Sequence, residues 1–113
     1  MKKDNRNVYG NYELLDTILN KAVGKTLRRL RVERNLTQVE LIKKMNNVIT
    51  EPTLSKYESG YSKIRMNIFF EFAKAFDLEP KDLYAEINNA YMEDLENNME
   101  SFLEYTKHDI QNK

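Results

Sequence analysis

The chain has 113 residues, of which 41% are hydrophobic and 32% are charged, and it contains no cysteine. This length predicts one domain with a small core, and the lack of cysteine excludes disulfides, thiolate metal sites and cysteine nucleophiles. No apolar run approaches the length of a membrane span, and the N-terminus lacks the apolar segment of a signal peptide, so we expect a cytoplasmic protein.

The charges are unevenly distributed although the net charge is zero. Residues 1–65 contain 14 Lys and Arg against 7 Asp and Glu, whereas residues 66–113 contain 4 against 11. A basic first half can attract a polyanion such as nucleic acid, while an acidic second half is better suited to contact with protein. Chance clustering of charges on solvated helix faces is the alternative interpretation.

The first predicted helix begins after a polar N-terminal segment. We expect residues 1–10 to be disordered and Asn11 to be the first candidate N-cap. Apolar residues recur at helical spacing over residues 14–30, which predicts one long helix or two helices joined near Gly24. Asn35 marks the predicted end.

A capping box predicts the start of the second helix. Thr37 is a good N-cap, and Glu40 follows it at the third helical position. Leu41, Ile42 and Met45 supply a buried stripe, and Asn46-Asn47 ends the helix.

The third predicted helix has a proline in its first turn. With Thr50 as the N-cap, Glu51 and Pro52 take the first two helical positions, where a backbone donor is not needed. Leu54 and Tyr57 then face the core, and Gly60 is the expected left-handed C-cap.

Two further helices complete the pattern, and no segment predicts a strand. Residues 66–76 form the most apolar helix. Pro80 opens the last one, in which apolar residues keep a spacing of three to four to about residue 106.

Three segments in this order, VGKTLRRLRVERNLTQVEL, TLSKYESG and FAKAFDLEPKDLY, carry a family resemblance. The stretch from Val23 to Tyr84 resembles the Cro/C1-type helix-turn-helix family of phage and bacterial regulators. The resemblance implies an all-α, five-helix lambda-repressor-like domain over residues 21–84, whose second and third helices read DNA. Residues 1–20 would be an N-terminal helical extension and residues 85–113 a long C-terminal amphipathic helix.

This sequence departs from the family pattern at one place. The turn between Met45 and Thr50 is about two residues longer than the usual short turn. We expect Val48 or Ile49 to fill the core beneath it.

The resemblance also implies which residues contact DNA. Gln38 would contact a phosphate and brace the third helix, with Thr37 beside it. Lysine, arginine and hydroxyl groups in the loop after the third helix would bind phosphates of the DNA backbone, which supplies affinity but no sequence information. The full set is Thr37, Gln38, Thr50, Glu51, Pro52, Thr53, Ser55, Lys56, Tyr61, Ser62, Lys63 and Arg65.

The residues expected to read bases differ in what they can offer. Lys56 can donate to guanine O6 or N7, or to a phosphate, and Glu51 can accept from cytosine N4. Pro52 offers only an apolar surface, for example to a thymine methyl. The alternative for Glu51 and Pro52 is that they simply begin the helix well. Arg31 and Glu58 match family positions that commonly form a partly buried ion pair, so we interpret them as structural.

Both ends of the chain have apolar faces that must be buried. We expect the ends to pack together and to build a homodimer, and the alternative is that they pack only within one chain. The residues expected at the dimer interface are Leu14, Leu15, Ile18, Tyr91, Leu95, Met99, Phe102 and Leu103.

The sequence therefore predicts a DNA-binding transcriptional regulator, most simply a dimeric repressor on a palindromic operator. A phage or mobile-element regulator, a restriction–modification controller and an antitoxin are the candidate subtypes. The alternative is a protein-interaction module that acts through its acidic C-terminal helix. No catalytic constellation is present, and His108 is a lone histidine, so we expect no enzyme activity, no metal and no cofactor.

Overall fold

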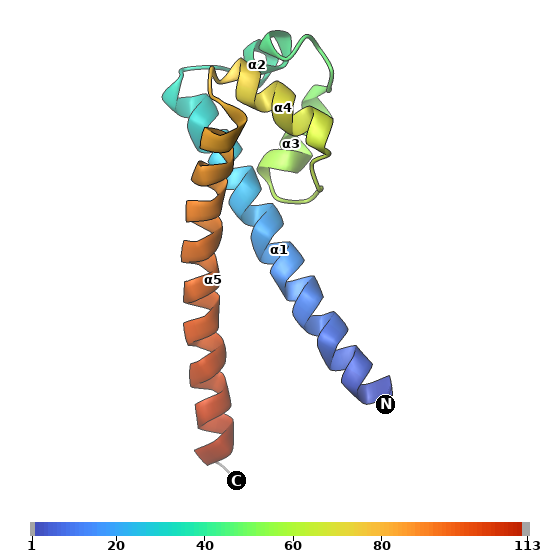
Figure 1. Cartoon of the computed structure of the whole chain (residues 1–113), viewed down its shortest axis with the longest axis vertical. Coiled ribbons are helices and arrows are strands. Elements are labelled where there is room, and N and C mark those ends of the chain that lie inside the picture. Colours follow the sequence, from blue (N-terminus) through green and yellow to red (C-terminus); the bar gives the residue numbers. More distant parts are fainter. Residues whose placement is uncertain (1, 112–113) are drawn as a thin grey trace.

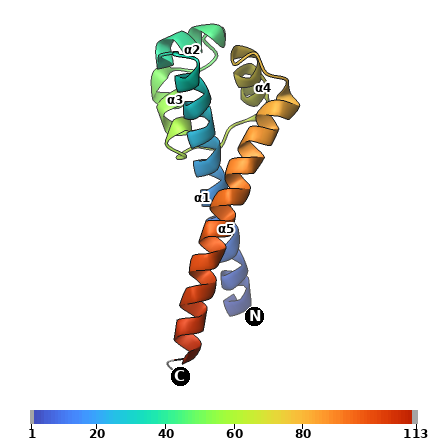
Figure 2. The same ribbon diagram turned by 90° about the vertical axis from the view of Figure 1, so that its left-hand side faces the viewer.

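The computed structural model describes the backbone of residues 2–111 and the side chains of residues 13–98. Residues 2–111 form five helices and contain no strand (Figure 1). The helices are α1 (Lys2–Glu33), α2 (Gln38–Lys44), α3 (Glu51–Glu58), α4 (Met66–Ala75) and α5 (Pro80–Gln111). The three short helices gather at one end, and α1 and α5 extend from them and separate toward the termini (Figures 1 and 2).

α1 is one continuous helix rather than two helices joined near Gly24. It also begins at Lys2, so the expectation of disorder is wrong for residues 2–10, and the expectation of a helix start near Asn11 is wrong as well. The physical reason is that extending an existing helix adds one hydrogen bond per residue without the cost of a new nucleus. Because no proline lies within α1, nothing interrupts its hydrogen-bond ladder.

The helix ends follow local sequence signals. Asn35, Asn46 and Asn47 have φ angles of 55°, 57° and 57°, and Gly60 has a φ of 76°. Asparagine and glycine tolerate this left-handed conformation better than other residues, which ends a helix and turns the chain. Each of these predicted stops is confirmed.

The N-cap of α2 is the predicted capping box. The Glu40 backbone N–H donates to the Thr37 hydroxyl at 3.1 Å, and the Thr37 backbone N–H donates to Glu40 Oε1 at 2.9 Å. The hydrogen bond from the Thr37 backbone lowers the pKa of Glu40, and the bond with the Thr37 side chain adds to the effect. The acid is therefore held in its charged form at the positive end of α2.

α3 begins where the sequence predicted, and Pro52 does not break it. The Thr50 hydroxyl accepts from the Thr53 backbone N–H, and Pro52 lies in the first turn. At the other end, Tyr61 N donates to Lys56 O at 2.9 Å and Gly60 N donates to Tyr57 O at 3.0 Å. This pair of bonds is a Schellman motif, which makes Gly60 the C′ residue.

The core joins all five helices. The lengthened turn contributes Ile49, which is 8% exposed, whereas Val48 is 46% exposed and faces outward. The turn therefore fills the core with its second aliphatic residue. The largest fully buried side chains are Phe72, Phe76, Leu27, Leu41, Met45, Leu54 and Leu83.

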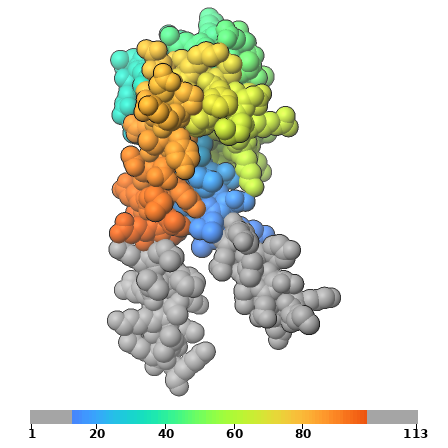
Figure 3. Space-filling view, viewed as in Figure 1, coloured from blue at the N-terminus to red at the C-terminus, as the bar shows by residue number. Residues whose placement is uncertain are grey.

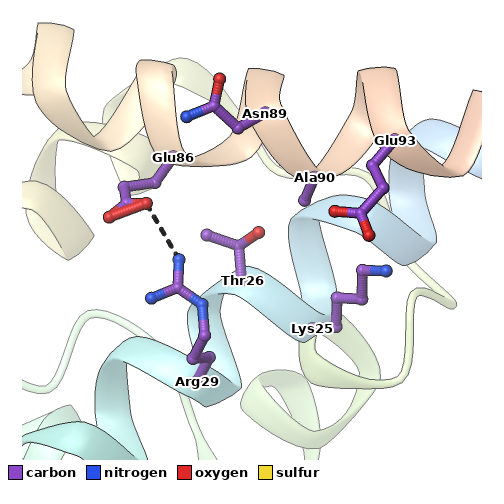
Figure 4. Close-up of a pocket in the computed structure, with 7 residues that line it drawn as sticks. All are labelled: Lys25, Thr26, Arg29, Glu86, Asn89, Ala90 and Glu93. Atoms are coloured by element: carbon purple, nitrogen blue, oxygen red, sulfur yellow. Dashed lines mark hydrogen bonds and ion pairs between the residues drawn. The ribbon is translucent and has the colours of Figure 1, made fainter.

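α5 packs along α1, so the expected extension and C-terminal segment are continuous with the domain. Arg29 Nη2 lies 3.0 Å from Glu86 Oε2, close to the buried Thr26 (Figure 4). Lys25 Nζ lies 2.6 Å from Asp94 Oδ1 further along the same contact. Among the described residues, no helix combines the length and the apolar character that a membrane span requires.

Candidate nucleic-acid interface

The start of α2 is connected to α3 by Gln38. Its amide Nε2 donates to Ser55 Oγ and to Glu58 Oε1, both at 3.2 Å. Gln38 therefore lies against α3, in the bracing position that the family resemblance implied. Ser55 is exposed and shares its hydroxyl with this amide, which sequence reasoning did not anticipate.

Arg31 fixes α3 to α1 through a two-pronged ion pair with Glu58. Arg31 Nε donates to Glu58 Oε2 at 2.7 Å, and Nη2 donates to Oε1 at 3.0 Å. A third bond runs from Nη1 to the Leu36 carbonyl at 2.9 Å. The hydrogen bond to Glu58 raises the pKa of Arg31, and burial opposes this effect only in part. With side chains 14% and 7% exposed, the pair is largely withdrawn from solvent.

Gly24 permits α3 to lie directly on α1. A Cβ at this position would lie 2.4 Å from Tyr57 O and 2.7 Å from Glu58 O, both backbone atoms. No residue larger than glycine fits without moving one helix. The position of α3 is therefore set by a close backbone approach at Gly24, followed by the Arg31–Glu58 pair about two turns further along α1.

α3 presents one polar face to solvent. Leu54 and Tyr57 are buried, as predicted, and Tyr57 packs edge-to-face on Phe72 with ring centroids 6.1 Å apart. Because those two side chains point inward, the opposite face of the helix is turned outward. The exposed residues of α3 and its N-cap are Thr50, Glu51, Pro52, Ser55 and Lys56, and Thr53 is partly exposed.

The loop between α3 and α4 carries the other residues predicted to contact DNA. Tyr61 is 80% exposed, Lys63 and Arg65 are exposed, and Ser62 is partly exposed. Lys63 Nζ lies 2.9 Å from Asp16 Oδ2 of α1. No signal in the sequence indicated this contact, because the two residues are 47 positions apart. In Figure 3 the surface of α2 and of the turn after it (cyan to green) lies at the top, and that of the loop (yellow-green) lies lower, next to α1 (blue).

The residues expected at a dimer interface have different environments. Ile18 is 5% exposed and is buried in the packing of the chain itself, so an interface role for this residue has to be withdrawn. Leu14 and Leu15 are exposed, and Tyr91 and Leu95 are partly exposed. The other three, Met99, Phe102 and Leu103, lie outside the described side chains, as does His108.

A helix-turn-helix family model matches residues 27–83, which is about half of the chain and includes α2, α3 and α4. The chain belongs to the Cro/C1-type helix-turn-helix family. It is accordingly a DNA-binding transcription regulator of this type rather than an enzyme. The matched segment contains the Arg31–Glu58 pair and every residue predicted to contact DNA.

Solved structures show the same fold. The clp gene regulator ClgR from Corynebacterium glutamicum is similar in two structures. One has a TM-score of 0.63 at 20% identity and covers 78% of this chain and 93% of that one. The other has a TM-score of 0.57 at 22% identity and covers 64% and 91%. At these identities the likeness shows the fold alone.

A third similar structure is the restriction-modification controller protein C.AhdI from Aeromonas hydrophila. Its TM-score is 0.52 at 25% identity, and the match covers 57% of this chain and 94% of that one. No curated protein matches the chain.

Proposed function

We propose that this protein is a sequence-specific transcriptional repressor that binds a palindromic operator as a homodimer in the cytoplasm. The observation that carries the proposal is the exposed face of α3. Lys56 and Glu51 are exposed there, and no ion pair among the described residues engages either side chain. Donors and acceptors held on a rigid helix, without partners of their own, suit the edges of bases in a major groove.

The residues around this face would supply affinity. Lys63 and Arg65 in the loop after α3 are exposed cations, which would neutralise phosphates. Gln38 would contact a phosphate while its amide holds Ser55 and Glu58. Phosphate contacts position a protein on DNA, and base contacts specify the sequence, so the two groups of residues have separate roles.

A homodimer is proposed because one recognition helix reads only a short half-site. Two copies related by a two-fold axis would place their α3 helices about 34–36 Å apart, one turn of DNA. A palindromic operator follows from this symmetry. The named regulators with similar structures, a clp gene regulator and a restriction-modification controller, are consistent with a role in gene control.

The test is a gel-shift titration with the DNA upstream of the protein's own gene. We expect binding that depends on an inverted repeat and that weakens steeply as salt is raised, because phosphate contacts release counterions. A duplex with one half-site scrambled is the matched control and should bind more weakly. Absence of binding at about 50 mM salt would contradict the proposal and favour a protein-interaction module.

A further inference from the structure

α1 supports the loop that follows α3, and it does so with residues outside the family segment. The family model begins at residue 27. Gly60, near the start of the loop, lies directly on the backbone of α1, because a Cβ at this position would come 2.8 Å from Lys21 Cα. Further along the loop, Ile64 lines an apolar cleft together with Leu19 of α1. The loop is therefore held against α1 at two places.

One exposed ion pair also joins the loop to α1. Lys63 Nζ lies 2.9 Å from Asp16 Oδ2, and the two side chains are 71% and 55% exposed. Among the described residues, neither side chain takes part in another ion pair. Because both groups are already in water, opening the pair leaves no charge buried, and pairs of this kind contribute little to stability. A competing anion can therefore open it.

DNA phosphate is the anion that Lys63 is proposed to bind. The ammonium group has to leave the Asp16 carboxylate or be shared between two anions. The flexible stem of lysine permits either, but the loop cannot move away as a whole, since Gly60 lies on α1. In the first case an ion pair is lost. In the second the carboxylate lies within the screening length, about 10 Å at about 0.1 M salt, and repels the phosphate.

Arg65 in the same loop offers an internal comparison. It is exposed, and no ion pair among the described residues engages its guanidinium. A phosphate that approaches Arg65 therefore meets a cation without a paired carboxylate. The two cations of one loop differ in this respect, and the difference comes from a residue of α1.

We propose that Asp16 is a positioning residue that competes with DNA phosphate for Lys63, so that α1 limits the affinity of the protein for DNA. The inference rests on the proposed function, because it takes the loop as a phosphate-binding element. Phosphate contacts carry no sequence information, so the limit applies equally to the operator and to other DNA. A residue outside the family segment thus determines how strongly the loop holds any duplex.

The first test removes the charge of Asp16 and keeps its size. In a gel shift, Asp16→Asn should bind the operator duplex and a scrambled duplex more tightly by the same factor, roughly two- to fivefold at low salt, the range that one exposed ion pair allows. Between about 50 and about 200 mM salt, the plot of log K against log salt should become steeper by up to about 0.9, the slope of one phosphate contact.

Glu13→Gln is the matched control for this measurement. Glu13 is exposed on the same helix and makes no ion pair with a described residue, so the variant removes one negative charge without releasing a lysine. Its salt slope should stay that of the wild type. A slope as steep as that of Asp16→Asn would mean that any lost acid on α1 has this effect, and it would overturn the proposal.

The second test asks whether Asp16 acts through Lys63. Lys63→Gln should cost less DNA affinity in the wild-type chain than in the Asp16→Asn chain, where the lysine binds phosphate without competition. Arg65→Gln should cost the same in both chains. Equal costs of Lys63→Gln in the two chains would mean that Asp16 acts on the DNA directly, against the proposal.

Urea unfolding checks that the fold is unchanged. Asp16→Asn should keep the wild-type midpoint, as expected for a solvated ion pair. A clear fall in the midpoint would place the effect of Asp16 in the stability of the fold, and competition for Lys63 would be rejected.

The outcomes separate this inference from the proposed function. If the wild type binds the inverted repeat and Asp16→Asn binds it no more tightly, the inference is overturned and the repressor stands. If Asp16→Asn tightens binding to both duplexes but the wild type does not prefer the inverted repeat, competition for Lys63 is supported and the repressor is contradicted. If neither chain binds either duplex at about 50 mM salt, both proposals fail.

Discussion

Replacing Gly24 with alanine has two opposing effects on the free energy of unfolding, and the structure shows which of them is larger. Alanine is the better helix former, and in a solvated helix the change would stabilise the protein by about 1 kcal/mol. In this chain the new Cβ would lie 2.4 Å from Tyr57 O, where real contacts do not fall below 3.0 Å. The helices would have to separate by at least 0.6 Å, the difference between those two distances.

The cost of that separation exceeds the gain in propensity. Overpacking a core costs about 1–3 kcal/mol, and the obstacles here are two backbone carbonyls rather than side chains that can rotate away. The upper part of that range minus the propensity gain leaves a net loss of about 1–2 kcal/mol. For a chain of this size the midpoint of thermal unfolding should fall by roughly 4–8 °C. Operator affinity should fall as well, because the shift displaces α3.

The assay is urea unfolding followed by far-ultraviolet circular dichroism, at one fixed protein concentration because dimerisation would stabilise the folded state. Ala85→Gly is the control: residue 85 is exposed in α5, so it measures the propensity difference without a clash, at about 0.5–1 kcal/mol. If Gly24→Ala unfolds at the same or a higher urea concentration than the wild type, the close approach does not constrain α3 and the reasoning is refuted.

Three further predictions concern single side chains. Arg31→Met should lower the free energy of unfolding by about 3–5 kcal/mol, because it leaves the buried Glu58 carboxylate without its charged partner. Urea unfolding measures this loss, and a loss below about 1 kcal/mol would mean that the ion pair behaves like one at the solvated surface. Lys56→Ala should weaken operator binding by about 1–3 kcal/mol in a gel shift. Lys81→Ala in α5 is the control and should leave operator binding unchanged. Equal operator affinities for the two variants would place Lys56 away from the bases. The folded-state pKa of Glu40 lies below the ordinary value of 4.5. Charged Glu40 therefore stabilises the folded state fully above pH 4.5, and this stabilisation is lost as the pH falls through the folded-state pKa. Glu40→Gln should therefore lower the unfolding temperature at about pH 7. In strongly acidic buffer the variant should match the wild type, and a difference in unfolding temperature that persists there would contradict this origin.

The sequence alone predicted the boundaries of the short helices, because short-range chemistry decides them. Thr37 and Glu40 satisfy each other's backbone donors within four residues, and Pro52 lies where no donor is needed. Asn46, Asn47 and Gly60 adopt left-handed conformations that their own side chains permit. These features depend on neighbours in the chain, so they are visible without a fold.

The family resemblance supplied the candidate interface, and the matched segment, residues 27–83, includes its residues. Residues predicted to contact DNA lie on α3, at the start of α2 and in the following loop, as expected from their positions in the motif. Which of them touches a base or a phosphate stays a prediction. Nothing in the motif indicated that Ser55 shares its hydroxyl with Gln38, because that bond depends on how closely the two helices pack.

Only the tertiary structure decided which surfaces are left for a partner. Periodicity gave Ile18 and Leu15 the same apolar character, yet Ile18 is buried and Leu15 is exposed. Residues three positions apart point about 60° apart around the helix axis, so the elements packed on α1 can cover one and not the other. The sequence offered Gly24 as a joint between two helices, and the structure uses it as the point where α3 lies against α1. The pairing of Asp16 with Lys63 joins residues 47 positions apart, a distance at which local pattern carries no information. The sequence thus determined the helices and the motif through short-range chemistry, and long-range packing determined where α3 lies on α1 and which apolar side chains of α1 stay exposed.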